Sequence, residues 1–153
     1  MKRTLLSFCM LLTACILYGQ AQEGTVKYQG GQQPAAVIEL AYAPDVVTAA
    51  MNDYLSKKGK SKGNDIKGFT TFRNTQATVN DSVNADLYFK MERKSRKEKE
   101  ITIISLLLTE PKDGPAIAGM HHLNMEQAKA YLNDLVPAIE AYNLELEIKG
   151  QNE

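Results

Sequence analysis

The side chains best suited to chemistry in this chain are its two histidines, His121 and His122. Imidazole titrates near neutral pH, so it can act as a general base or as a metal ligand. Adjacent residues point to different sides of a helix or a strand, however, and His122 together with Glu126 would supply at most two ligands to one ion. We therefore expect two exposed histidines and no bound metal or cofactor.

Sequence motifs for catalysis are missing from the chain. It contains no G-x-S-x-G nucleophile elbow, no dinucleotide-binding glycine pattern, no calcium-binding loop and no H-E-x-x-H zinc motif. Gly59-Lys60-Ser61 matches the end of a phosphate-binding loop, but Tyr54 stands where that loop needs its first glycine. These observations favour a protein without catalytic residues. An enzyme whose carboxylates or histidines meet only in the folded chain remains an alternative.

Charge is segregated along the chain. Segment 57–67 has five lysines and one aspartate, and segment 90–100 has six basic and three acidic side chains. If the fold brings the segments together, they form a basic patch for an anionic surface, made by Lys58, Lys60, Lys62, Arg93, Lys94, Arg96 and Lys97. The interleaved glutamates favour the simpler interpretation, a solvated loop and a charged hairpin turn. Neither segment contains aromatic residues to stack on bases, so nucleic acid is not an expected partner.

The N-terminus has the layout of a secretory signal peptide. Two basic residues precede the mainly apolar run 5–18, and Gly19 and Ala21 supply small residues at a cleavage position. Cleavage after Ala21 is favoured. The alternative is acylation of Cys15, which would leave a lipoprotein anchored at that residue. Either way we expect an exported protein, periplasmic or extracellular.

The exported chain would be slightly acidic and free of cysteine. Removing residues 1–21 takes away two basic residues and leaves 16 basic and 18 acidic side chains. Cys9 and Cys15 are removed as well in that case, so neither a disulfide nor a thiolate metal site is expected. No later apolar stretch approaches the roughly 18 residues that a transmembrane helix needs.

Ser82 is a candidate glycosylation site. Asp81-Ser82-Val83 resembles the three-residue acceptor pattern for O-glycans on some exported bacterial proteins. Such a short pattern also arises in ordinary polar turns, and a glycan there would sit on a loop.

Alternation of apolar and polar residues predicts most of the strands. Residues 35–42 and 85–92 alternate along their length, and residues 68–74 have strand composition. Residues 101–108 follow a charged turn and are expected to pair with 85–92 as an antiparallel hairpin. Residues 22–34 form an N-terminal segment that can contribute an edge strand.

Two helices are expected. Pro44 suits the first turn of a helix, and apolar residues recur at helical spacing from Val47 to Leu55. From Met125 to Leu146 apolar residues recur at intervals of three and four, which indicates one stripe on a long helix with Pro137 on its solvent side. Residues 144–148 also alternate as a strand would. Helix is favoured there because Leu and Glu lack β-branches, and a terminal strand is the alternative.

These elements predict an α+β fold in the order β-α-β-β-β-α. We expect a single domain over residues 35–149, a two-layer structure with an antiparallel sheet of four or five strands and two helices on one face, followed by a polar tail at 150–153. Strand 101–108 is apolar on both sides, so the second face of the sheet must also be covered. The candidate covers are segment 22–34, the loop 111–120, a second subunit or an apolar ligand.

Three functions are compatible with this sequence. The favoured one is a small exported binding domain that contacts a second copy or another protein through the second sheet face or the final helix. The second is a structural protein of the cell envelope that touches an anionic surface through segments 57–67 and 90–100. The third is an enzyme whose site is assembled only by the fold.

Overall fold

The described part of the chain folds into an antiparallel sheet and two helices. A computed structural model describes residues 19–58, 63–76, 84–109 and 125–151. In chain order the elements are β1 (Gln22–Tyr28), β2 (Gly31–Leu40), α2 (Pro44–Lys57), β3 (Asn64–Ile66), β4 (Phe69–Gln76), β5 (Asn84–Arg93), β6 (Thr102–Thr109) and α3 (Met125–Gln151). The strands are ordered β1-β2-β6-β5-β4-β3, and every neighbouring pair is antiparallel. The predicted α+β class is confirmed.

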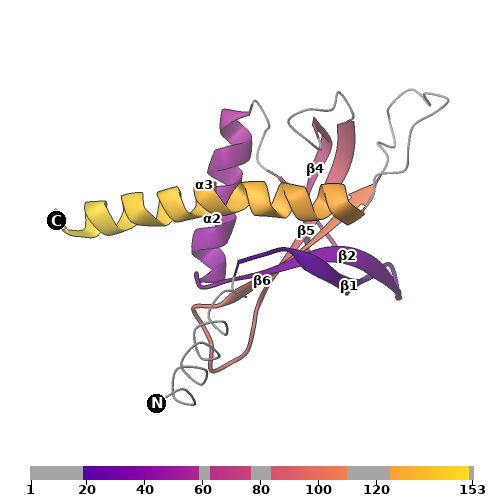
Figure 1. The fold of residues 1–153 in the computed structure, drawn as a ribbon, viewed down its shortest axis with the longest axis horizontal. Helices are drawn as coiled ribbons and strands as arrows, with labels where there is room; N and C mark the ends of the chain where they lie inside the picture. The colour runs from indigo at the N-terminus through magenta and orange to yellow at the C-terminus, as the bar shows by residue number, and fades with distance from the viewer. Residues whose placement is uncertain (1–18, 59–62, 77–83, 110–124, 152–153) are drawn as a thin grey trace, which may run out of the picture.

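Both helices lie on one face of the sheet, as predicted, and α3 crosses α2 (Figure 1). Each helix turns its periodic apolar residues toward the sheet, because only that face can remove them from water. The side chains buried between the layers are Ala36, Ile38, Leu40, Val47, Ala50, Met51, Leu55, Phe72, Ala85, Leu87, Phe89, Ile104, Leu106, Ala128, Tyr131, Leu132, Leu135 and Ile139. This main core holds the two layers together.

The sheet has six strands rather than the expected four or five. The unexpected strand is β3, in a segment that reads as an exposed loop, and it pairs with β4 through a tight turn at Lys67 and Gly68. Both turn residues have positive φ, +54° and +80°, as the commonest two-residue hairpin turns require. Asp65 supports the turn, since its Oδ1 accepts the Gly68 N–H at 3.1 Å. Lysine is an unusual residue for such a turn, so the sequence pattern did not reveal this hairpin.

The second face of the sheet is covered by the N-terminal hairpin. Val26 and Tyr28 of β1 pack there with Phe69, Tyr88 and Leu107. The Tyr28 ring makes edge contacts with Phe69 and Tyr88, at centroid distances of 5.3 and 5.4 Å. Three strands separate β1 from β4 in the sheet order, so the sheet must be strongly coiled for these rings to meet. Of the covers considered from the sequence, segment 22–34 supplies this one, whereas loop 111–120 lies outside the described residues.

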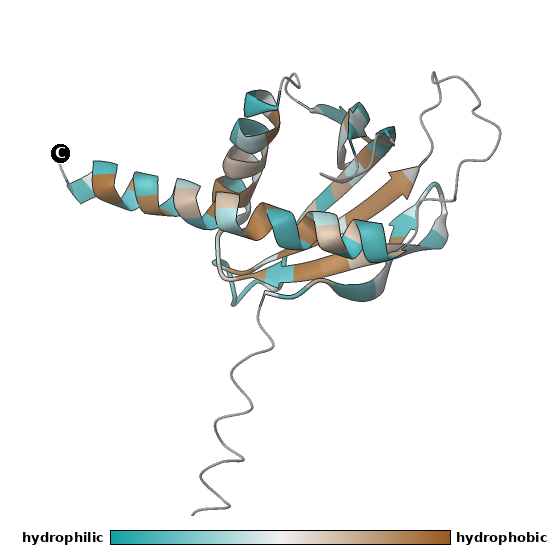
Figure 2. Ribbon diagram, turned by 45° about the horizontal axis from the view of Figure 1, so that its top comes forward, coloured by the Kyte–Doolittle hydropathy of each residue, from teal (hydrophilic) through white to brown (hydrophobic). Residues whose placement is uncertain are grey.

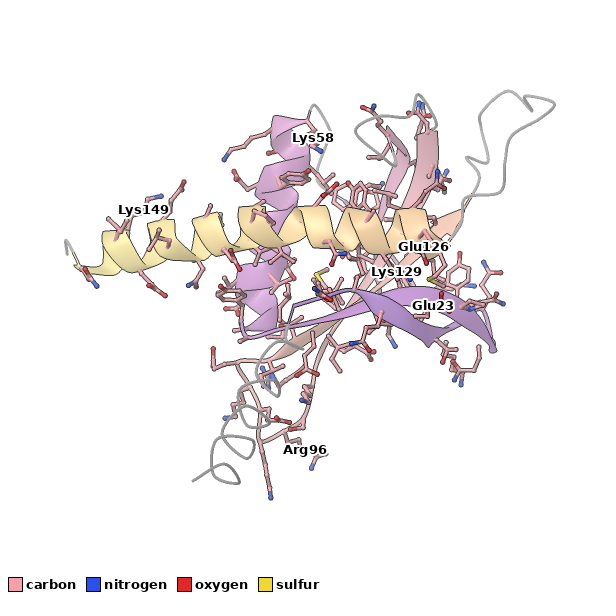
Figure 3. All side chains as sticks on the ribbon, in the orientation of Figure 1. Glu23, Lys58, Arg96, Glu126, Lys129 and Lys149 are labelled. Atoms are coloured by element: carbon pink, nitrogen blue, oxygen red, sulfur yellow. The ribbon has the colours of Figure 1, made fainter. Side chains whose placement is uncertain are left out.

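The C-terminal helix runs from Met125 to Gln151 and includes residues 144–148, so the terminal strand considered as an alternative does not form. Its apolar stripe is buried as far as Ile139, and Pro137 lies on the solvent side. The start of β1 is tied to this helix, because Asn133 Oδ1 accepts the Ala21 N–H at 2.9 Å and Lys129 Nζ lies 3.8 Å from Glu23 (Figure 3). Within the described ranges, no helix has the length and apolar character that crossing a membrane requires.

The covering role of Tyr28 can be tested by replacing it. The Tyr28→Ala substitution should lower the free energy of unfolding by about 2 kcal/mol, because it removes two aromatic edge contacts and exposes the apolar side chains beneath them. Urea unfolding measures this change. Lys27→Ala is the control: its side chain is exposed on the same strand, so the change should stay within about 0.5 kcal/mol. Equal effects of the two substitutions would contradict the covering role.

Tyr131 offers a second test, because its hydroxyl is buried in the main core and has no hydrogen-bond partner among the described residues. Burial raises the pKa of this phenol well above its usual 10.0, and Tyr54 and Asp134 act in the same direction. Tyr131→Phe should raise the free energy of unfolding by about 1 kcal/mol at neutral pH, since it removes an unsatisfied buried group. Above pH 10 the unfolded chain ionises this residue and the folded chain does not, so the parent protein should lose stability more steeply than the variant. Urea unfolding at pH 7 and pH 11 measures both effects, and a less stable variant at pH 7 would contradict them.

Candidate functional site

Asp86 is the acidic side chain that is buried in the described part of the chain, and its role is structural. Among the described residues, no group of three or more histidine, cysteine, aspartate or glutamate side chains could hold a metal ion. The carboxylate of Asp86 is 1 % exposed, and its Oδ1 accepts the Asn74 N–H at 2.9 Å. Asn74 has a φ of +49° and lies where the pairing of β4 with β5 shifts between Phe72 and Thr75. Asp86 therefore stabilises a bulge in the sheet.

Several candidate residues fall outside the part of the chain that the structure describes. These are the lysines of the loop after α2, the candidate glycosylation site and both histidines: Lys60, Lys62, Ser82, His121 and His122. Their roles stay as stated from the sequence.

The described ends of the two basic segments lie far apart. Lys58 is at the end of α2, where its Nζ lies 4.3 Å from the centre of the Tyr54 ring as a cation–π contact. Arg96 is in the turn between β5 and β6, at the opposite end of the molecule (Figure 3). Lys58 and Arg96 therefore do not belong to one basic patch.

We call residues 93–100, the end of β5 and the turn that follows it, the hairpin tip. Polar contacts among its residues and with Glu39 fix its shape. Lys94 Nζ lies 2.7 Å from Glu39 Oε1 and 3.7 Å from Glu98 Oε1. Ser95 donates to Glu98 Oε2 at 3.1 Å and accepts the Glu98 N–H at 3.1 Å. Two of the nearby glutamates are thereby occupied by Lys94 and Ser95.

The remaining charges of the hairpin tip are mostly positive. Within the described residues, the exposed cations that make no ion pair there are Arg93, Arg96, Lys97 and Lys99. Glu92 forms an ion pair with Lys90 at 2.9 Å. Of the acidic side chains in the turn, Glu100 is the one that makes no ion pair among the described residues. The hairpin tip is therefore an exposed basic surface at one end of the protein.

The C-terminal end of α3 is the second unusual surface. The helix continues past α2 and away from the sheet (Figure 1), and its last turns include hydrophobic residues (Figure 2). Leu144 is 56 % exposed, Leu146 40 % and Ile148 51 %. We call residues 143–151 the projecting segment. It spans roughly 13 Å at 1.5 Å per residue, and Asn143 Nδ2 donates to Glu147 Oε1 at 2.7 Å within it.

An apolar stripe runs along the solvent side of α3 into the projecting segment. Pro137, Ala141, Leu144 and Ile148 are all exposed and are separated by four, three and four residues. This spacing places them on one face of a helix, opposite the stripe that packs on the sheet. We call these four residues the outer seam. Glu140 and Glu147 lie along one side of the seam and Glu145 along the other, so its borders are acidic.

A small hollow of about 100 Å³ joins the outer seam to the end of α2. It is lined by Asp53, Tyr54, Lys57, Ala138, Ala141, Tyr142 and Glu145. Lys57 and Asp53 form an ion pair of 2.7 Å. The hydrogen bond and charge of Asp53 raise the pKa of Lys57, and Glu145 adds to this effect from α3. The two alanines leave room for a side chain from outside to approach the crossing of the helices.

A larger hollow of about 490 Å³ opens beside the β1–β2 turn. Its described lining is Tyr28, Gln29, Gly31, Gln33, Pro34, Leu107 and Leu108. The residues of this lining carry no charged side chain, and its polar side-chain groups are the Tyr28 hydroxyl and the amides of Gln29 and Gln33.

The outer seam was missed at the sequence level, although its signal is present. Pro137 and Ala141 are unremarkable solvent-side residues by themselves, and the stronger stripe toward the sheet accounts for most apolar residues of the helix. The four-three-four spacing becomes meaningful only once residues 144–148 are known to be helical. Read as a strand, Leu144 and Ile148 would share a face with Leu146 instead.

Comparison with known proteins supplies no relative: no family model, no curated protein and no solved structure matches the chain. Functional inference therefore rests on the outer seam, the projecting segment and the hairpin tip.

Proposed function

We propose that the protein is an exported, non-catalytic binding domain that contacts a protein partner through the projecting segment of α3. The observation that supports the proposal is the position of the large apolar side chains that remain exposed to water. Among the described residues, all the large apolar side chains that are exposed belong to the last eight residues of α3: Leu144, Leu146 and Ile148. Fully burying one such side chain contributes about 1.5–3 kcal/mol, so a partner that covers them gains a substantial free energy.

The geometry of the segment supports this proposal. Its helix is already formed, so a partner does not have to order it on binding. The second sheet face, which the sequence offered as the other contact surface, is occupied by Val26 and Tyr28 of the same chain. An exposed helix face is a common way to present apolar anchors at intervals of three and four residues.

A photo-reactive amino acid tests the proposal in the organism that makes the protein. A benzophenone side chain in place of Ile148 should give a discrete cross-linked product, because the partner covers this position. The same probe in place of Thr25, which is exposed on β1, is the control and should give none. Adding Leu144→Ser to the Ile148 probe should reduce the yield, because both side chains lie on one face of the helix. Equal labelling from both positions, or none from the projecting segment, would refute the proposed contact.

A second candidate function is contact with an anionic surface of the cell envelope. The observation that favours it is the hairpin tip, where four exposed cations make no ion pair among the described residues. Each basic side chain near an anionic membrane contributes about 1 kcal/mol of attraction.

Vesicle binding tests this second function. Vesicles with about 30 % phosphatidylglycerol should bind the protein at low salt, and the affinity should fall steeply as salt shortens the Debye length. Arg96→Ser together with Lys97→Ser should weaken binding by at least about tenfold. Lys27→Ser with Lys67→Ser removes the same charge from other exposed positions and should have a smaller effect. Binding that ignores salt, or that these two double variants weaken equally, would rule this function out.

A further inference from the structure

One chain carries two exposed surfaces of opposite charge. The outer seam is apolar with borders formed by Glu140, Glu145 and Glu147, and Lys149 is the lone cation among residues 137–151. The hairpin tip presents four cations that make no ion pair within the described residues. Each surface therefore has the character that the other one lacks.

Pairing two outer seams with each other is electrostatically unfavourable. In an antiparallel helix pair the same border of each seam meets its copy, so Glu140 and Glu147 face each other and Glu145 faces Glu145. In a parallel pair Glu145 faces Glu140 and Glu147 of the other helix. Like charges at such positions oppose association and select a partner of opposite charge. The acidic borders thus favour a basic partner over a second seam.

The hairpin tip has the chemistry of such a partner. Arginine and lysine carry long apolar stems that can cover leucine and isoleucine side chains while their charged ends remain in water. Their charged ends can then reach the carboxylates at both borders of the seam, with arginine able to bind a carboxylate through two parallel hydrogen bonds. The Lys94–Glu39 ion pair of 2.7 Å and the Ser95–Glu98 hydrogen bonds fix the turn that presents these residues.

We propose that the protein associates with itself head to tail, with the hairpin tip of one copy seated on the outer seam of the next. This inference rests on the proposed function and names its partner as a second copy of this chain. Arg96 and Lys149 mark the two surfaces, which lie on different sides of the molecule (Figure 3). Each copy therefore contacts two neighbours, one through its hairpin tip and the other through its outer seam. Such a contact is heterologous, so association can continue from molecule to molecule.

The association is expected to be weak and sensitive to salt. The contact is limited to a short helix face and one turn, and interfaces below about 1,200 Å² generally belong to transient complexes. Its charged contacts are exposed, so they should weaken when salt shortens the Debye length to about 3 Å at 1 M. Growth of the assembly with protein concentration is the expected behaviour.

Charge reversal on each surface tests the proposal with protein purified from the exported fraction. The helix variant carries Glu140→Lys and Glu147→Lys, and the tip variant carries Arg96→Glu and Lys97→Glu. Sedimentation velocity from about 10 µM to about 1 mM covers the affinity range expected of a small interface. The parent protein should form larger species as concentration rises, and each variant alone should self-associate at least about tenfold more weakly.

Restoration by opposite charges is the decisive measurement. An equimolar mixture of the helix variant and the tip variant should associate, because the unchanged tip of the helix variant meets the unchanged seam of the tip variant, and the basic helix of the first meets the acidic tip of the second. A chain that carries all four substitutions should associate with itself again. Lys27→Glu with Lys67→Glu changes the net charge as the tip variant does, but away from the hairpin tip, and should behave like the parent protein. Far-UV circular dichroism checks the fold of each variant, and Leu144→Ser, which leaves charge unchanged, should also weaken association.

The outcomes separate this inference from the proposed function. A parent protein that stays monomeric over the whole range, or a mixture of variants that fails to associate, overturns head-to-tail association. In that case a cross-link from position 148 to a different protein still supports a binding domain. If the cross-linking experiment also yields no product, the proposed function fails as well.

Discussion

The burial of β6 on both faces is the constraint on which the rest of the structure depends. This strand lies between β2 and β5, with Ile104 and Leu106 toward the helices and Ser105 and Leu107 toward the other face. Two helices on one side of a sheet cover only half of such a strand. The coiled β1–β2 hairpin supplies the other half by bringing Tyr28 over the strands that follow β6 in the sheet order. The helices and the hairpin therefore meet one hydrophobic requirement from opposite sides.

The same constraint explains why the exposed surfaces lie at the ends of the molecule. The apolar stripe of α3 is buried in the core as far as Ile139. The helix then continues for about three more turns. At the β5–β6 end, the strands run past the core into a turn whose glutamates are partly neutralised by Lys94 and Lys90. The middle of the sheet is covered on both faces, so the exposed apolar and basic surfaces of the described residues lie at the ends of the molecule.

Local sequence patterns predicted the helices and strands that bury one continuous apolar face. The stripe of α3, the helix after Pro44 and the β5–β6 hairpin follow from helical spacing and from alternation, which depend only on nearby residues. The strand β3 did not follow, because its turn places Lys67 in a conformation that usually belongs to glycine or asparagine. Residues 144–148 fit helix and strand periodicity alike, and the helix, favoured because Leu and Glu lack β-branches, is the element that the structure contains.

The location of the basic residues depends on topology rather than on local pattern. Lys58 follows a helix and Arg96 lies in the turn between β5 and β6, and only the arrangement of the sheet beneath α2 shows that they face opposite ends of the protein (Figure 3). In the same way, the sequence named several covers for the second sheet face, and the coiling of the sheet decided that Tyr28 fills this role. Long-range geometry therefore determined which surfaces remained available.

The position of Ala21 in the fold bears on when the predicted leader, residues 1–21, could be removed relative to folding. A peptidase must draw the residues around the bond that it cuts into its own cleft, in extended and accessible form. In the folded protein Ala21 is half-buried, its N–H is held by Asn133 of α3, and the next residue already begins β1. If the chain is exported and cut after Ala21, as the sequence predicts, the cut comes before α3 docks against β1, and the hydrogen bond from Ala21 to Asn133 is lost with the leader. For such a chain the order is removal of the leader first and closure of the sheet afterwards.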